Sequence, residues 1–177
     1  MYVKRVETLP PLSHADSSLA GEQVGVRISR LGLTLAYYPV PKAEWISFPE
    51  MPGMDEMRNP VIFAAFREDQ IIGRCVLLAE RNQWMELVDI RVDPAFRRCG
   101  AGKAMVGAAL AYSVKQGFAG LKTFTSDRNP VMCQFCEHCG FMLQGMDRMA
   151  LSRLPEERER PMAQRACQLI FYLQKGS

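Results

Sequence analysis

The chain has 177 residues, of which 48% are hydrophobic and 23% charged, and its formal net charge is +3. This composition is ordinary for a globular protein, the length fits a single domain, and the mild charge gives no support for nucleic-acid binding. The longest apolar run, Val61 to Phe66, is too short to cross a bilayer, and the N-terminus lacks the apolar core of a signal peptide. We therefore expect a cytoplasmic protein with no membrane partner, in which the six cysteines are reduced thiols.

Residues 1–23 are of mixed composition and contain the breaker Pro10-Pro11, so we expect a loosely held segment. The alternating segments 24–30 and 31–38 predict two strands around a tight turn. Residues 39–60 contain five prolines and predict a long loop, and long ordered loops in compact domains are often functional.

Residues 61–80 hold two apolar runs on either side of a polar turn, which predicts a hairpin, and residues 84–92 predict its third strand. Pro94 should end that strand because proline cannot donate to a strand ladder. From Gly100 to Gly117 apolar residues recur at helical spacing, and a further strand is predicted at 121–126. A strand, a crossover helix and a strand form one β-α-β unit, so the strands on either side of this helix should pair in parallel.

Asn129 and Pro130 are typical of the first residues of a helix, which Gly140 should end. Residues 141–151 and 165–174 predict two closing strands, separated by a charged loop. The order of elements therefore predicts a mixed α/β, or α+β, fold with a mixed sheet and helices on its faces.

The stretch RVDPAFRRCGAGKAM, residues 91–105, combines charge and bare backbone at the start of a helix. A helix N-terminus exposes unpaired N–H groups and a partial positive charge. Gly100 and Gly102 leave this backbone open to a ligand, and Arg97 and Arg98 add formal charge. The pattern predicts an anion-binding turn, although the spacing matches neither of the two common glycine-rich phosphate loops. A tight turn beside two surface arginines would explain the same residues.

The segment Arg97-Arg98-Cys99-Gly100-Ala101-Gly102 resembles the R/Q-x-x-G-x-G/A signature of the GNAT superfamily of acyl-CoA-dependent N-acetyltransferases, and it follows a strand, as in that family. The resemblance runs from about Val61 to the C-terminus. The segments LVDIRVDPAFRRCGAGKAM, GLKTFTSDRNPVMCQFCEHCGF and GMDRMALSRLPEE, with the late strand ACQLIFYL, are similar to the streptothricin acetyltransferase branch. The resemblance implies a central, mostly antiparallel sheet that is splayed at its one parallel pair and carries helices on both faces.

The resemblance also implies how the chain is organised, with residues 1–177 forming a single acetyltransferase domain. Residues 24–60 would supply acceptor-side strands and a loop, and residues 61–150 the acyl-CoA-binding core. Residues 151–177 would form a charged loop and the closing strand.

Acetyl-CoA is the implied cosubstrate, with no metal. The backbone amides from Arg97 to Lys103 would hold the CoA pyrophosphate, and the backbone of residues 90–92 would hold the pantetheine arm and polarise the thioester carbonyl. Asn129 would touch the pantetheine or the acetyl end, although helix capping explains this residue equally well. The cofactor-binding residues that the resemblance implies are Ile90, Arg91, Val92, Arg97, Arg98, Cys99, Gly100, Ala101, Gly102, Lys103, Asn129 and Phe135.

Direct transfer needs a group that accepts a proton, because an alkylamine with a pKa of about 10.4 is mostly protonated. Glu86 stands where several family members carry a catalytic glutamate, and Asp89 stands where streptothricin-type sequences carry an acid; Val88 replaces a further acid of those sequences. Three residues apart on a strand, the two carboxylates point to opposite faces unless a bulge intervenes. Either could simply be a solvated carboxylate; Glu86 is favoured as the catalytic base, and both stay open.

The family's usual proton donor to the departing CoA thiolate is a tyrosine, and Cys136 takes its place in this chain. A thiol with a reference pKa of about 8.5 can donate a proton, yet a small buried helix residue explains Cys136 as well. Cys133, Cys136 and Cys139, with His138 between them, invite a zinc or iron–sulfur interpretation. Within a helix, however, steps of three residues turn through about 300°, so the first and last sulfurs diverge, and we expect no metal.

The predicted acceptor is a primary amine, and the streptothricin-like resemblance suggests one on a cationic antibiotic. Amines of metabolites, polyamines or proteins are alternatives, and so is an acyl-CoA-binding module without catalysis. Acidic residues could attract a cation by long-range steering. They are Glu44, Glu50, Asp55 and Glu56 in the proline-rich loop, and Asp147 near the end. The sequence leaves the oligomeric state open, a homodimer included.

Overall fold

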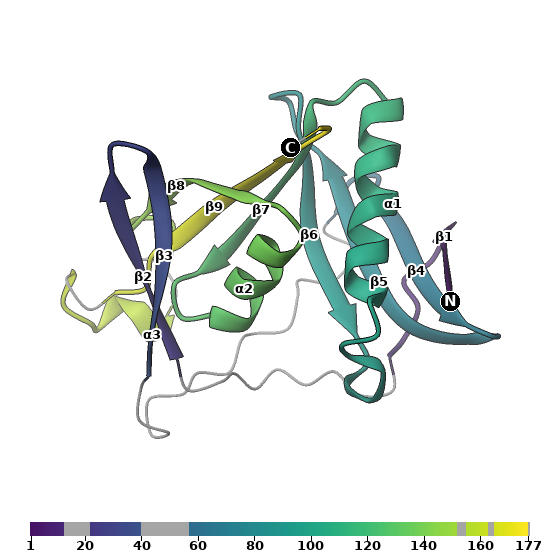
Figure 1. Cartoon of the computed structure of the whole chain (residues 1–177), viewed down its shortest axis with the longest axis horizontal. Helices are drawn as coiled ribbons and strands as arrows, with labels where there is room; N and C mark the ends of the chain where they lie inside the picture. The colour runs from purple at the N-terminus through teal and green to yellow at the C-terminus, as the bar shows by residue number, and fades with distance from the viewer. Residues whose placement is uncertain (13–21, 40–56, 152–154, 163–164, 177) are drawn as a thin grey trace. The chain divides into compact units, whose positions relative to one another are not determined.

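The computed structural model describes residues 1–12, 22–39, 57–151, 155–162 and 165–176 (Figure 1). Packing divides the chain into two compact units. The first comprises Met1–Ser17, Pro49–Thr123 and Leu173–Ser177, and the second comprises Ser18–Phe48 and Phe124–Tyr172. The single domain expected from the chain length stays a prediction.

The first unit is built on four strands that pair antiparallel in the order β1, β4, β5, β6. Their bounds are Tyr2–Val6, Val61–Arg67, Gln70–Ala79 and Met85–Val92. The beginning of β7 (Gly120–Ser126) pairs with β6 in parallel, Met85 with Leu121 and Glu86 with Lys122. The predicted hairpin, its third strand and the parallel pair are thereby confirmed.

Strand β1 has no counterpart among the predicted elements, because the sequence indicates a loosely held segment there. The structure places β1 along β4, with Tyr2 opposite Phe66 and Val6 opposite Ile62, and the rings of Tyr2 and Phe66 stack with centroids 5.2 Å apart. A five-residue strand has little pattern of its own. Its conformation comes from covering the β4 edge, a long-range contact that a local pattern does not contain.

Helix α1 (Ala101–Lys115) contacts β1, β4, β5 and β6 of this unit (Figure 1). Gly73 on β5 permits the close approach, since a Cβ atom there would lie 2.9 Å from both the carbonyl oxygen of Arg91 and the terminal methyl of Met105. At the other end of the helix, the buried Ser113 hydroxyl donates a 2.8 Å hydrogen bond to the carbonyl oxygen of Gly120. The helix is thus fixed to β5 at its beginning and to β7 at its end.

The second unit contains the hairpin of β2 (Glu22–Ser29) and β3 (Gly32–Pro39) and the helix α2 (Pro130–His138). It also contains the antiparallel pair of β8 (Met142–Asp147) and β9 (Gln168–Gln174). The last residues of β9, from Leu173 onward, belong to the first unit. The predicted strands and the helix cap are confirmed within a few residues. The two units show the predicted class, a mixed α+β fold with a mostly antiparallel sheet and one parallel pair.

A buried carboxylate anchors the charged loop of the second unit. Glu157, in the short helix α3 (Pro155–Arg158), is 3% exposed and accepts hydrogen bonds of 2.8 Å from the Arg128 guanidinium and from the main-chain N–H of Ala166. A buried charge needs such partners to offset its desolvation. At least one charged residue of this loop, Glu157, therefore holds the chain in place.

Two glycine substitutions should have opposite effects on stability. Gly120 has φ +157°, and a Cβ atom there would overlap the carbonyl oxygen of Leu173, whereas Gly107 lies in α1 with nothing within 4 Å of an added Cβ. We expect Gly107→Ala to raise the free energy of unfolding by about 0.5–1 kcal/mol and Gly120→Ala to lower it by roughly 2 kcal/mol or more. Urea titrations followed by circular dichroism measure both. Equal midpoints for the two variants would contradict the close packing of Gly120.

Candidate active site

The turn between β6 and α1 is held by a buried carboxylate. Asp93 is 2% exposed, its Oδ1 accepts from the N–H of Ala95 at 2.9 Å, and its own N–H donates to the Ile72 carbonyl at 2.9 Å. These bonds fix a short 3-10 turn at Pro94–Phe96. Arg98 (φ +63°) and Gly100 (φ +86°) then take left-handed conformations that turn the chain into α1. A folded corner thus presents the helix N-terminus.

The N–H groups at this corner are open. No side chain caps the helix at Gly100, and a Cβ atom at Gly100 would meet nothing within 4 Å. Among the described residues, none accepts from the N–H groups of residues 98–103; the first such bond runs from Ala104 to the Gly100 carbonyl at 2.9 Å. Arg97, Arg98 and Lys103 are exposed around it. Open N–H groups, a helix dipole and three cations make this corner suited to an anion.

Strand β6 has one edge that is only partly paired. Ile90, Arg91 and Val92 pair with β5 on one side. On the other side, the parallel ladder to β7 stops after Glu86 and Lys122, and the Leu87 carbonyl accepts a 2.8 Å hydrogen bond from the Thr123 hydroxyl. Among the described residues of the first unit, no strand pairs with the outer edge of residues 90–92. Their main chain can therefore bind an extended ligand as an added strand does.

A bulge in β6 decides how the two candidate bases are oriented. Val76 pairs with Asp89, but the next residue of β5, Leu77, pairs with Leu87, so Val88 is an extra residue in β6. Glu86 in turn stands opposite Leu78. Residues that stand directly opposite each other on paired strands have their side chains on the same face of the sheet. Val76 and Leu78, the β5 partners of Asp89 and Glu86, are two residues apart and therefore also share a face. The bulge therefore places Glu86 and Asp89 on one face, whereas a regular strand would separate them.

Asp89 is engaged by two arginines. Its Oδ1 lies 2.9 Å from Nε of Arg91, and its Oδ2 lies 3.6 Å from Nε of Arg74. The Asp89 side chain is 9% exposed. Arg74 also donates to the carbonyl oxygen of Pro10 at 2.7 Å, which holds it in place. The Asp89 carboxylate is therefore paired with cations on both sides, with a hydrogen bond to Arg91 and a longer ion pair to Arg74.

Glu86 lies beside one carboxylate and one cation. Lys122, its partner in the parallel ladder, has Nζ at 3.2 and 3.1 Å from the two carboxylate oxygens of Glu80. The pKa of Glu86 is raised, chiefly by burial and then by the negative charge of Glu80, while Lys122 opposes the rise. A half-buried carboxyl with a raised pKa is the usual character of a general base. Sequence patterns point to neither Glu80 nor Lys122, because the strand pairing brings them to Glu86.

The remaining predicted residues lie in the second unit, on or beside α2. The Asn129 side chain accepts from the N–H of Met132 at 2.9 Å and so caps the helix. Phe135 is half-buried. Cys133 and Cys136 are fully buried, and burial raises the pKa of both thiols, that of Cys133 to about 12. A buried thiol that resists ionisation fits helix packing better than proton donation.

Tyr37 is a residue of this region that the sequence did not single out. Its hydroxyl donates a 2.6 Å hydrogen bond to Glu137 on α2, and burial followed by this bond raises its pKa. One hundred residues separate the two partners. Only the packing of β3 against the neighbouring elements brings them together, so no local signal could have revealed the contact.

The sequence also suggested metal-ligating side chains and acidic residues that could attract a cation. The described residues contain no group of three or more side chains suited to a metal. Asp147 is exposed, and its carboxylate accepts from the N–H groups of Met149 and Ala150, at 2.7 and 3.2 Å. The acidic residues predicted to steer a cation, Glu44, Glu50, Asp55 and Glu56, lie outside the described residues.

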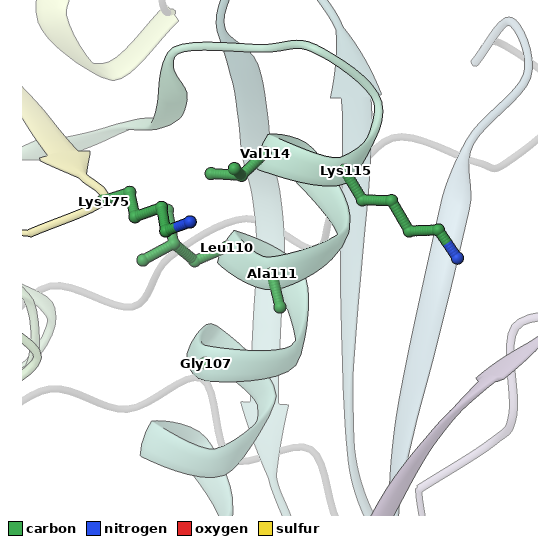
Figure 2. A pocket seen from close by; sticks show the side chains of 6 residues that line it. All are labelled: Gly107, Leu110, Ala111, Val114, Lys115 and Lys175. Atoms are coloured by element: carbon green, nitrogen blue, oxygen red, sulfur yellow. The ribbon is translucent and has the colours of Figure 1, made fainter.

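A hollow of about 460 Å³ lies beside the second half of α1, where Leu110 and Val114 point toward Lys175 (Figure 2). It is lined by small and apolar side chains with lysines beside them, namely Gly107, Leu110, Ala111, Val114, Lys115 and Lys175. None of the predicted site residues lines it. The hollow is therefore not part of the candidate active site.

The fold agrees with comparisons to known proteins. Residues 33–141, more than half of the 177-residue chain, match the acetyltransferase (GNAT) family, and the chain belongs to that family. The resemblance predicted from Arg97 to Gly102 is thereby confirmed. Among the described helices, none has the length and apolar character needed to span a bilayer.

Streptothricin acetyltransferases are among the similar proteins. Streptothricin acetyltransferase A of Bacillus subtilis (strain 168) is 28% identical over 104 residues, which are 59% of this chain and 60% of that protein, less than two thirds of its length. A Bacillus anthracis str. Ames protein assigned as a streptothricin acetyltransferase was solved in complex with acetyl coenzyme A. It aligns with a TM-score of 0.80 and 23% identity over 97% of this chain and 98% of that one. Nourseothricin acetyltransferase aligns with a TM-score of 0.72 and 21% identity over 98% and 99%. At these identities the two structures show a shared fold.

Replacing Glu86 should stabilise the folded protein at neutral pH. Because its pKa is raised on folding, Glu86 lowers the stability progressively as the pH rises above the ordinary glutamate pKa, and the loss is complete once the pH exceeds the raised pKa. We expect Glu86→Gln to have the larger free energy of unfolding at neutral pH. The difference from wild type should disappear below the ordinary glutamate pKa of about 4.3, where both side chains are neutral. Urea unfolding across this pH range measures it. A variant no more stable than wild type at neutral pH would contradict unfavourable burial of the Glu86 charge.

Proposed function

We propose that the protein transfers an acetyl group from acetyl-CoA to a primary amine by direct attack. The observation that carries this proposal is the open, positively charged start of α1 immediately after β6, the strand that presents Glu86. A diphosphate site and a candidate base then lie along one continuous segment, as a reaction between a coenzyme thioester and an amine requires. Membership of the acetyltransferase (GNAT) family supports the same reaction.

The corner at Gly100 is the proposed site for the coenzyme diphosphate. The N–H groups of residues 98–103 can each donate a hydrogen bond, and Arg97, Arg98 and Lys103 supply charge. Each helix-end interaction contributes about 0.3–1 kcal/mol when exposed, and several donors converge on one diphosphate. The outer edge of residues 90–92 is the proposed site for the pantetheine arm, which would add to β6 by main-chain hydrogen bonds.

Glu86 is the proposed proton acceptor. Its raised pKa makes it a stronger base than an exposed glutamate, which favours proton uptake from an amine. Asp89 shares the same face of β6, but its oxygens are already engaged in ion pairs with Arg74 and Arg91. The proposal therefore assigns base catalysis to Glu86 and a role in holding the two arginines to Asp89.

The reaction follows from these assignments. The ammonium form of the acceptor gives one proton to Glu86, directly or through a water molecule, and the amine lone pair then forms the C–N bond. The thioester C–S bond breaks and its electron pair leaves on sulfur. The attacking nitrogen, cationic after the C–N bond forms, releases a second proton to solvent and the sulfur takes one up, so that a neutral amide and the free CoA thiol result. Attack geometry supplies most of the acceleration, and a base contributes about 10²–10⁴-fold. The burial of Cys136 argues against a thiol as the proton donor, and a CoA thiolate can leave without one.

The proposed acceptor is an amine on a streptothricin-like cationic antibiotic. The similarity to streptothricin acetyltransferase A and to the two structural neighbours supports this class. Acetylation of a metabolite, polyamine or protein amine, or coenzyme binding without turnover, would appear as different outcomes of the activity measurement described below.

Charge reversal in the first turn of α1 should weaken coenzyme binding. Lys103 is exposed at the proposed diphosphate site, so we expect Lys103→Glu to lower the affinity for acetyl-CoA roughly tenfold while leaving phosphate-free pantetheine binding unchanged. Isothermal titration calorimetry measures both ligands. Lys115→Glu is the matched control, because it makes the same charge change about 18 Å further along the same helix. Equal losses in the two variants, or no acetyl-CoA binding by wild type, would contradict the proposed site.

CoA release separates the two carboxylates and identifies the acceptor. With streptothricin, a polyamine and a lysine peptide as acceptors, we expect the fastest turnover with streptothricin. Glu86→Gln should lower kcat by about 10²–10⁴-fold, whereas Asp89→Asn should lower it by less than about tenfold. Coenzyme binding without turnover of any amine would support the non-catalytic alternative. A larger loss for Asp89→Asn than for Glu86→Gln would reverse the assignment of the base.

A further inference from the structure

Two charged side chains, those of Glu80 and Lys122, lie beside the candidate base Glu86. Glu80 directly follows β5, Glu86 lies in β6 and Lys122 lies in β7. The main-chain N–H of Glu80 donates to the Trp84 carbonyl at 3.0 Å, which closes the β5–β6 connection and fixes the position of Glu80. Lys122 is fixed by its ladder pairing with Glu86. The main chain of all three residues is therefore held by the sheet.

We propose that Glu80 and Lys122 are positioning residues for proton uptake by Glu86: Lys122 holds the Glu80 carboxylate in place, and Glu80 accepts a hydrogen bond from the protonated Glu86. This inference rests on the proposed function of Glu86 as the base. Nothing in the chain's similarity to acetyltransferases assigns either residue a role.

The count of charges supports the inference. Lys122 is 9% exposed as a residue, and its ammonium bonds both oxygens of Glu80 at 3.2 and 3.1 Å. With Glu86 also ionised, the group holds two negative charges and one positive charge in a half-buried place. One proton on Glu86 makes the group neutral and provides a donor for Glu80. The three residues thus form a group suited to taking up a single proton.

The other charged side chains nearby are engaged elsewhere, so Glu80 and Lys122 are the charged groups that act on the pKa of Glu86. Along the same face of the sheet, Asp89 lies beyond the bulge and pairs with Arg74 and Arg91 rather than with Glu86. The opposite face of β5, at Gly73, approaches Met105 of α1, so that helix lies on the other side of the strands. The charged groups that act on the pKa of Glu86 are Glu80, which raises it, and Lys122, which lowers it.

The step balances as a proton transfer alone. The acceptor ammonium loses one proton, the Glu86 carboxylate gains it, and the new Glu86 O–H donates to a Glu80 carboxylate oxygen. Neither Glu80 nor Lys122 changes its protonation state. The proton later leaves Glu86 for solvent, which restores the carboxylate for the next acceptor molecule.

The decisive experiment follows the Glu86 carboxyl group directly by ¹³C NMR, with its signal assigned from Glu86→Gln. We expect Glu80→Gln to shift the Glu86 titration to lower pH and Lys122→Met to shift the first proton uptake of the carboxyl pair to higher pH. Lys122→Arg keeps the charge and should restore the wild-type titration. Glu68→Gln, the same substitution in the exposed turn at the other end of β5, is the matched control and should shift nothing. Circular dichroism verifies that each variant folds.

The rate measurement tests whether this titration is used in catalysis. The acid limb of the kcat/KM profile should follow the same two opposite shifts, and Glu80→Gln should also lower the plateau kcat roughly tenfold, because its amide accepts a weaker hydrogen bond. If wild type turns over acetyl-CoA while the Glu86 titration is the same in all folded variants, the inference is overturned and the acetyltransferase function stands. If the titration shifts as expected but no amine is acetylated, the proposed function is overturned, and the catalytic role of Glu80 and Lys122 with it.

Discussion

The extra residue in β6 is the constraint on which the candidate site depends. With Val88 inserted against the regular register of β5, Glu86 and Asp89 face the same side of the sheet, and the parallel ladder to β7 ends close to this point. One bulge thereby gathers the acidic side chains and leaves the outer edge of residues 90–92 without a strand partner among the described residues of the first unit. Without it, one of the two carboxylates would point into the layer between the strands and α1.

Glu86 and Asp89 carry the same functional group but lie in different surroundings. Asp89 is clamped between Arg74 and Arg91, which stabilise its charge. Glu86 is half-buried beside a second carboxylate whose own cation is already engaged. The same functional group is therefore held in ion pairs at one position and has a raised pKa at the other. The stability lost by burying Glu86 as a charge is the physical counterpart of its strength as a base.

The corner at Gly100 differs from the two carboxylates because main-chain N–H groups, rather than side chains, are its open polar groups. Buried Asp93 fixes the turn, left-handed backbone at Arg98 and Gly100 directs the chain, and the first N–H groups of α1 are left open. The side chains there supply charge and solubility and leave the backbone accessible. Gly100 is therefore the strongest local signal in the sequence, since its φ of +86° is a backbone conformation that residues with a Cβ atom rarely adopt.

Local patterns in the sequence were enough to predict the strands from residue 24 onward, the helices begun by Gly100 and Asn129, and the fold class, because each depends on local periodicity, caps and glycines. Anion binding at the corner by Gly100 stays a prediction from the same kind of local pattern. The sequence could name Glu86 and Asp89 but could not orient them, since a bulge is a property of the register between two strands. Only the tertiary structure placed β1 on the edge of β4, joined Tyr37 to Glu137 and brought Glu80 and Lys122 to Glu86. These contacts link residues far apart in the chain, and no single segment contains the information that selects them.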